Sequence, residues 1–278
     1  MQKVLANAGV ASRRAIEEMV QQGRVAVNGR VMVDLPVMID PERDKVTVDD
    51  ELVKIRSEYG KGAQPPVYII MNKPKGVYTT NVAQGEQTRA IDLLPPDFKQ
   101  RVYPVGRLDA DSQGLLLLTN DGELTNKLTH PRYGVAKTYR AVMDGFVTGE
   151  KIEELKRGVW LADPHKGGFK TSKAHIEVVR RSHQRTTLDI TMGESRNRQI
   201  RRMLAKVGHK VRDVTRIKFG PMELGTLKPG QSRLVMPREL KALRSAASKS
   251  DRDGEREGKT PATTATPARR HEKKNPSS

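Results

Sequence analysis

The first 57 residues carry two periodicities of apolar positions, a helical one followed by an alternating one. Residues 2–22 place apolar side chains every three or four positions, which predicts two helices, the second capped by Ser12 and ended by Gly23. Residues 24–31 then alternate around Asn28-Gly29, a pair typical of a two-residue hairpin turn. A second hairpin is predicted around Asp49-Asp50. Residues 1–57 are therefore predicted to form one small unit of helices and hairpins.

The larger part of the chain mixes strand-like and helix-like runs. Residues 58–66 lack periodicity and are predicted to be a linker. Strand-like runs follow at 67–71, 115–119, 139–143, 174–179 and 187–191, and helical runs at 150–157 and 199–207. Because few of them form a regular strand–helix–strand repeat, residues 67–247 are predicted to be one α+β domain rather than a doubly wound sheet. Residues 248–278 hold no large apolar residue and are predicted to be a disordered basic tail.

Charge then narrows the class of partner. The 278 residues include 51 Lys and Arg against 33 Asp and Glu, a net charge of +18, and the pI is about 10.1. Charge kept only for solubility is the alternative, but a small domain stays soluble with a net charge of about 2–8. A chain this basic is expected to bind a polyanion, most commonly the phosphate backbone of a nucleic acid.

Several classes of protein are excluded by what the sequence lacks. With no cysteine and no pair of its six histidines at metal-ligand spacing, a thiolate metal site and a zinc-dependent base deaminase are excluded, and no metal is expected. No phosphate-binding loop, dinucleotide fingerprint or methyl-donor fingerprint occurs, so no cofactor is expected. No signal peptide and no apolar run of about 20 residues is visible, and we expect a cytoplasmic monomer with no membrane partner.

The densest candidate for chemistry is a polar loop that leads into a run of four leucines. Residues 106–114 contain Asp109 and Asp111, and residues 115–118 predict a strand buried on both faces. An aspartate held next to such a rigid strand is well placed to act as a nucleophile or base. Spacing alone favours the alternative, in which Asp109 and Asp111 only form Asx turns.

Basic residues form the second candidate feature. Residues 196–218 hold nine basic residues and one acid, and a helix there presents charge suited to phosphate groups rather than an ordinary solvated face. The expected RNA contacts are Arg198, Arg201 and Arg202 there and Arg13, Arg14, Arg24 and Arg30 in the small unit. Lys73 and Lys75 are weaker candidates for the same role. Tyr139 lies in a strand-like run, where a tyrosine is usually core, although it could stack on a base.

At this point the motifs carry a resemblance. The block 106–122 resembles the signature of the RsuA/RluB-type rRNA pseudouridine synthases, and segments 137–139 and 194–203 resemble that family's other motifs in order and spacing. Residues 68–76 resemble its opening strand and turn. Segments 11–14 and 23–29 resemble the small RNA-binding module named after ribosomal protein S-four. The resemblance covers about 1–245, and residues 120–131 are most similar to the large-subunit type B enzymes.

The resemblance implies a fold and a set of roles. It implies an S-four-like RNA-binding module followed by a catalytic domain of mixed, mainly antiparallel sheet. Asp109 would be the nucleophile, and two routes stay open: attack on the sugar or assistance to glycal formation. Tyr139 would stack on the flipped uracil, and Arg196 would pair with Asp109. The implied pocket residues are Arg107, Leu108 and Ile200. Ser195 departs from the family, which commonly has glycine there.

The resemblance also implies the substrate. The expected activity is the cofactor-free isomerisation of one uridine to pseudouridine, in 23S rRNA within a pre-ribosomal particle. Two alternatives stay open at this point. The same chemistry could act on 16S rRNA or tRNA, or the chain could be a non-catalytic RNA-binding factor of ribosome assembly.

Overall fold

The chain folds into two units. A computed structural model describes residues 1–55, 65–163 and 167–257, with side chains as far as residue 248. Contacts divide the chain into Met1–Pro65 and Pro66–Ser278, and the division falls at the predicted linker, most of which lies outside the described residues.

The N-terminal unit consists of two helices and two hairpins, as the apolar pattern predicted. Ser12 caps the second helix by accepting a hydrogen bond from the Ala15 amide at 3.1 Å. Asn28 and Gly29 both have positive φ, as a two-residue hairpin turn requires. The elements are α1 (Gln2–Asn7), α2 (Arg13–Gln21), β1 (Val25–Val27), β2 (Arg30–Met32), β3 (Val46–Val48) and β4 (Glu51–Leu52), with sheet order β2-β1-β3-β4.

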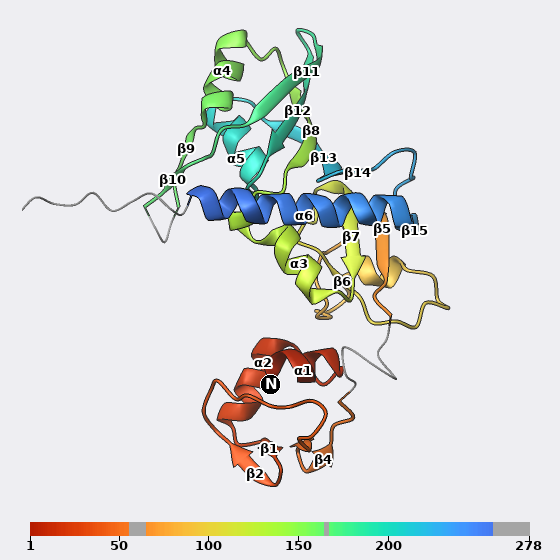
Figure 1. Cartoon of the computed structure of the whole chain (residues 1–278). Coiled ribbons are helices and arrows are strands. Elements are labelled where there is room, and N and C mark those ends of the chain that lie inside the picture. Colours follow the sequence, from red (N-terminus) through yellow and green to blue (C-terminus); the bar gives the residue numbers. More distant parts are fainter. Residues whose placement is uncertain (56–64, 164–166, 258–278) are drawn as a thin grey trace, which may run out of the picture. The chain divides into compact units, whose positions relative to one another are not determined.

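The second unit is built on a sheet of nine strands within the described residues (Figure 1). Its order is β11-β12-β8-β13-β7-β5-β15, with β14 paired to β13 and β6 to β7, and only the β13–β7 pair is parallel. The predicted α+β domain with a mixed, mainly antiparallel sheet is thus confirmed. The strands are β5 (Tyr68–Lys73), β6 (Tyr103–Pro104), β7 (Gln113–Thr119), β8 (Lys137–Asp144), β11 (His175–Arg181), β12 (Arg185–Met192), β13 (Val211–Phe219), β14 (Met222–Glu223) and β15 (Ser232–Leu234).

Apolar layers cover both faces of this sheet. Alternate residues of β5 and β7 point to opposite faces, so Leu116 packs with α4 and α5 while Leu117 packs with α3 and α6. The four leucines of β7 are fully buried, which confirms the predicted strand buried on both faces. The remaining elements are η1 (Ala90–Leu93), α3 (Gly122–Thr129), η2 (Pro131–Tyr133), α4 (Gly149–Arg157), α5 (Gln199–Lys206), α6 (Pro237–Glu257) and the small pair β9 (Trp160–Leu161) and β10 (Phe169–Lys170).

Helix α6 corrects one sequence-based prediction. It runs to Glu257, so residues 248–257, predicted to begin a disordered tail, are helical. Leu243 and Ala247 are buried against the sheet side that carries α3, and a helix nucleated by such packing propagates through polar residues at little cost. The rest of the predicted tail, 258–278, lies outside the described residues.

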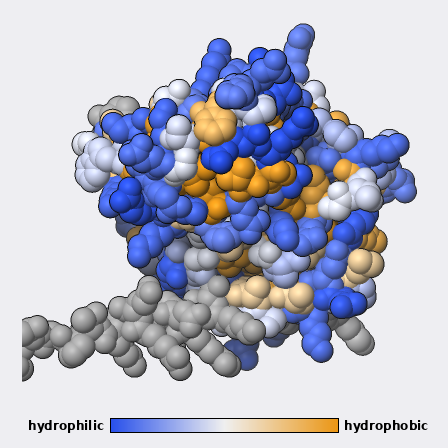
Figure 2. Space-filling view, turned by 90° about the horizontal axis from the view of Figure 1, so that it is seen from above, coloured by the Kyte–Doolittle hydropathy of each residue, from blue (hydrophilic) through white to orange (hydrophobic). Residues whose placement is uncertain are grey.

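The surface of the second unit is largely polar. Figure 2 shows a face covered mostly by hydrophilic residues, with apolar residues visible between them in the middle of the view. No helix of the described residues is long and apolar enough to cross a membrane.

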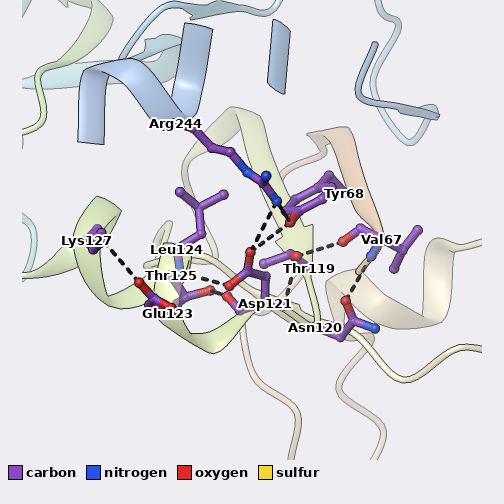
Figure 3. Close-up of polar contacts among 10 residues, drawn as sticks. All are labelled: Val67, Tyr68, Thr119, Asn120, Asp121, Glu123, Leu124, Thr125, Lys127 and Arg244. Atoms are coloured by element: carbon purple, nitrogen blue, oxygen red, sulfur yellow. Dashed lines mark hydrogen bonds and ion pairs between the residues drawn. The ribbon is translucent and has the colours of Figure 1, made fainter. Parts of the chain in front are cut away.

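A polar network joins α6 to the sheet (Figure 3). The Tyr68 hydroxyl on β5 donates to Oδ2 of Asp121 at 2.7 Å and accepts from Nη2 of Arg244 at 2.8 Å. The other carboxylate oxygen of Asp121 accepts from the Leu124 amide at 2.9 Å and caps α3. Burial and the adjacent Asp121 carboxylate raise the pKa of Tyr68 above its usual value. One hydroxyl therefore connects β5, the start of α3 and helix α6.

We predict that Tyr68→Phe lowers the free energy of unfolding by about 1 kcal/mol, because it leaves two polar partners without their shared hydroxyl. For a domain of this size the melting temperature should fall by about 2–4 °C in calorimetry. Since the folded-state pKa is raised, this contribution is complete below pH 10 and is lost as the pH rises through the folded value. An unchanged melting temperature at pH 7 would show that the network contributes nothing to stability.

Gly114 allows β7 and β13 to approach closely at the point where they pair in parallel. It is in register with Arg216 and has a φ of +111°. A Cβ at this position would lie 2.3 Å from the Arg216 carbonyl oxygen and 2.6 Å from its amide nitrogen. Both the dihedral angle and the available space therefore require glycine here.

We predict that Gly114→Ala destabilises the protein by about 3 kcal/mol, through backbone strain and overpacking together. Gly149→Ala is the matched control, because a Cβ there meets no atom within 4 Å. It should be neutral or slightly stabilising, since alanine favours helix. Denaturant unfolding measures both variants, and equal midpoints for the two would contradict the close approach.

Candidate active site

A cavity of about 270 Å³ opens beside the parallel pair of strands, close to the lower end of the range for small-molecule sites. Its walls come from the loop before β7, from β8, from the segment that leads into α5, and from β13. β7 and β13 pair over only two residue pairs. The six predicted catalytic and pocket residues all line this cavity: Arg107, Leu108, Asp109, Tyr139, Arg196 and Ile200.

The loop that carries Asp109 is clamped by main-chain and side-chain hydrogen bonds. The Thr79 hydroxyl donates to the Leu108 carbonyl at 2.8 Å and lies 3.3 Å from the Leu108 amide, which donates back to it. The Gly76 amide donates to the Ala110 carbonyl at 2.7 Å, and the Ser112 amide to the Asp109 carbonyl at 3.0 Å. The backbone on both sides of Asp109 is thus fixed, as precise chemistry requires.

Lys73 lies beneath this loop, and its placement corrects a sequence-based interpretation. It was a candidate for a surface phosphate contact, but its side chain is fully buried and donates to the carbonyls of Pro74 and Val77 at 2.9 and 2.7 Å. Burial lowers the pKa of Lys73 to about 8, while the carboxylates of Asp109 and Asp111 favour its charged form. Lys73 therefore supports the loop electrostatically from inside.

Tyr139 sits on β8 with 5% of its surface exposed, and its hydroxyl lies 3.4 Å from Oγ of Ser195. Ser195 is the residue that departs from the family pattern. It is absent from the residues with positive φ, so its Cβ meets no backbone penalty. The serine adds a polar neighbour to the tyrosine at the cavity wall.

Arg196 is not paired with Asp109 in this structure. Its guanidinium lies 3.9 Å from the centre of the Phe169 ring, and its Nε is 3.5 Å from a carboxylate oxygen of Glu194. Gln199 fixes this segment by accepting from the Arg196 amide at 2.8 Å and donating to Glu194 at 2.6 Å. Arg196 is thus held at the cavity wall by contacts that the sequence did not reveal.

Two further cations at the cavity were missed by the sequence analysis. Lys137 begins β8 and is 6% exposed, and Arg216 on β13 is 1% exposed. Both line the cavity. The signals were present, since Lys137 opens the segment 137–139 that carries Tyr139, and Arg216 belongs to the basic stretch. Within the described residues no group of three or more His, Asp or Glu could hold a metal ion.

Comparison with known proteins identifies the fold and the chemistry. Residues 67–206 match the family described as RNA pseudouridylate synthase, and residues 2–33 match the S4 domain. The chain belongs to the RNA pseudouridine synthase family. The synthase is an isomerase, and its N-terminal unit is an RNA-binding S4 domain, as the resemblance implied.

Relatives of the synthase match almost its whole described length. It is 42% identical over 241 residues to an uncharacterized RNA pseudouridine synthase of Aquifex aeolicus, covering 87% of this chain and 92% of that one. It is 40% identical over 253 residues to ribosomal large subunit pseudouridine synthase B of Bacillus subtilis, and the match covers 89% of this chain and 96% of that protein. A crystal structure of a pseudouridylate synthase superimposes with a TM-score of 0.61 at 26% identity, and the match covers 86% of this chain and 96% of that one.

The arginines predicted to contact RNA fall into different structural settings. In the S4 domain all four are exposed, but Arg24 forms two hydrogen bonds to Asp49, at 2.7 and 2.6 Å. On α5, Arg202 donates to the Ala162 carbonyl. That these arginines contact RNA stays a prediction.

Arg201 and Arg198 share Asp111, a carboxylate of the same loop as Asp109. Arg198 has a positive φ of 48° and lies 3.0 Å from Oδ2 of Asp111. Arg201 is 14% exposed, lies 3.3 Å from the same oxygen, and donates to the Asp111 and Val211 carbonyls at 3.0 and 3.2 Å. The Arg201 side chain thus connects α5, β13 and the Asp109 loop.

We predict that Arg201→Gln destabilises the synthase by about 1–3 kcal/mol and lowers kcat. The reason is that it removes the guanidinium that joins the loop of Asp111 to β13 and α5. The slope of RNA affinity against salt concentration should stay the same, since the Arg201 guanidinium is already engaged by Asp111 and two carbonyls of the protein. Melting curves and filter binding at several salt concentrations measure both quantities. A shallower salt slope with an unchanged melting temperature would instead identify Arg201 as a phosphate contact.

Proposed function

We propose that the synthase converts one uridine of 23S rRNA to pseudouridine. Two relatives support this choice of RNA, since proteins of Bacillus subtilis and Pseudomonas aeruginosa, 40% and 38% identical, are named ribosomal large subunit pseudouridine synthase B. The second of them is matched over 61% of its length and the first over 96%, so the first carries more weight.

The observation that carries the mechanism is the position of Asp109 on a fixed loop at the wall of a base-sized cavity. The reaction breaks the bond between C1′ of ribose and N1 of uracil and rejoins C1′ to C5, without a change in oxidation state. In our proposal the Asp109 carboxylate drives the first cleavage, by attack on C1′ or by taking the 2′ proton. Tyr139, nearly buried on β8, stacks on the extruded uracil, and Ile200 closes the wall behind it.

Arg196 would join this arrangement when the RNA enters. Pairing with Asp109 would require its guanidinium to leave Phe169 and Glu194, which hold it now. Arg107, exposed at the cavity edge, would fill the space in the RNA stack that the extruded uridine leaves. The S4 domain, with Arg13, Arg14 and Arg30 exposed, would bind rRNA phosphates and position the catalytic domain.

Pseudouridine mapping tests this proposal, by carbodiimide labelling and primer extension on rRNA from a strain that lacks the gene. We predict one missing stop in 23S rRNA that the wild-type gene restores and Asp109→Asn does not. The amide keeps the shape of the side chain but removes the nucleophile, so the rate should fall at least about 10³-fold.

Asp213→Asn is the matched control, because Asp213 is partly exposed and pairs with Lys75 away from the cavity lining. It should restore the stop. A missing stop in 16S rRNA or in tRNA would move the substrate to that RNA, and restoration by Asp109→Asn would overturn the catalytic assignment. If no uridine changes while rRNA still binds, the chain is an assembly factor.

A further inference from the structure

The floor of the active-site cavity carries an excess of buried positive charge. Seven charged side chains line the cavity, and Asp109 is the only acid among them. Two of the cations, Lys137 and Arg216, are almost fully buried. In the part of the chain that the structure describes, neither has a carboxylate within ion-pairing distance. Buried cations are usually paired, so this arrangement is costly unless it serves a ligand.

The hydrogen bonds of these two side chains leave donors available. Lys137 Nζ donates to the Val135 carbonyl at 2.9 Å. Arg216 Nε donates to the Leu115 carbonyl at 2.8 Å and Nη1 to the Arg107 carbonyl at 3.4 Å, while Nη2 is buried without any partner. A buried guanidinium nitrogen without an acceptor normally costs about 1–3 kcal/mol or more. An acceptor supplied by the substrate would remove that cost.

The two cations also lie near each other. Both lie over the Phe219 ring in cation–π contacts, with 5.0 Å from Lys137 Nζ and 5.1 Å from the central carbon of the Arg216 guanidinium to the ring centre. Burial and, to a smaller extent, the charge of Arg216 lower the pKa of Lys137 to about 8. No acidic group from the elements around Lys137 contributes to this shift. The site therefore favours an anion close to Lys137.

The reaction itself generates such an anion. When the bond between C1′ and N1 breaks, its electron pair stays with the base, which becomes uracilate with charge spread over N1, O2 and O4. The electron deficiency at C1′ is met by a bond to an Asp109 oxygen or by loss of the 2′ proton. After the base turns, C5 bonds to C1′ while the bond from C1′ to Asp109 breaks or, on the glycal route, C2′ regains its proton from Asp109. The C5 proton then leaves to a base, and N1 takes a proton from water.

We propose that Lys137 and Arg216 form an anion subsite that binds the carbonyl oxygens of the departing uracil and stabilises uracilate. The interaction strengthens as the charge develops, which is the condition for lowering the barrier rather than only binding substrate. It also retains the free base in the cavity while C5 turns toward C1′. The burial of both side chains makes a contact to an RNA phosphate unsuitable as their role. The proposal rests on the pseudouridine synthase reaction and not on the choice of RNA.

Lys137→Met tests the subsite, because methionine fills a similar volume without charge. Under single-turnover conditions, tritium release from RNA containing 5-tritiated uridine should slow about 100-fold, the usual effect of losing one donor to a developing anion. RNA affinity should change less than about threefold. The melting temperature should stay or rise, since an unpaired buried charge is removed. A lower melting temperature with an unchanged rate would make Lys137 structural and overturn the proposal.

Lys218→Met is the matched control. It removes the same charge, but Lys218 is half exposed and pairs with Glu223 at 2.6 Å outside this cavity. We expect wild-type rates of tritium release from it. An equal loss of rate in the two variants would attribute the effect to overall charge and overturn the subsite.

Two further readouts separate leaving-group stabilisation from a general defect. Fluorine at C5 makes uracilate a better leaving group, which then needs less stabilisation. The loss of rate caused by Lys137→Met should therefore be at least about tenfold smaller on RNA that contains 5-fluorouridine. The rate is measured as the disappearance of 5-fluorouridine from nuclease digests of the RNA. In the wild type, kcat/KM should fall as the pH rises through about 8, because Lys137 then loses its proton. Lys137→Arg should keep its activity over this range. An equal defect on both RNAs, or the same alkaline loss in Lys137→Met, would overturn the proposal.

Discussion

The candidate active site depends on the close main-chain contact between Gly114 and Arg216. This contact joins the only parallel pair in the described sheet, and it is short because Gly114 has no side chain. It brings the loop before β7, which carries Asp109, to the strand that carries Arg216. The antiparallel register of β13 with β8 then sets Tyr139 opposite Arg216. Three residues that are far apart in the sequence thus meet at one cavity through backbone geometry.

Local patterns in the sequence predicted those elements whose signal is local. The Asn28-Gly29 hairpin, the Ser12 cap and the four leucines of β7 each follow from neighbouring residues, and the structure has all of them. Strand β13 was missed because its many basic residues hid a strand in which alternate positions are buried. Helix α6 was not predicted, and its last turns were assigned to a disordered tail because they lack apolar residues, although they continue a helix packed on the sheet.

The site was predicted as a set of residues but not as a set of contacts. The motifs located Asp109, Tyr139 and Arg196, and the structure places all three at one cavity. The sequence could not show that Lys73 is buried, since a lysine next to a proline resembles an ordinary surface residue. Nor could it show that Phe169 and Glu194 hold Arg196, because they come from different segments that only the folded sheet brings together. Burial and pairing are properties of tertiary structure.

The place of β5, the strand that carries Tyr68, has a consequence for when the sheet can be completed during synthesis of the chain. Strand β5 lies between β7 and β15, and β15 and α6 are the last described elements of the sequence. While the chain is being synthesised, β5 therefore lacks its outer neighbour, and its apolar residues stay uncovered by α6, until some 165 residues more have followed it. A nascent catalytic domain carries an open sheet edge through most of its synthesis. Completion of the sheet, and with it a protected apolar face, is thus a late event that only the C-terminal segment can bring about.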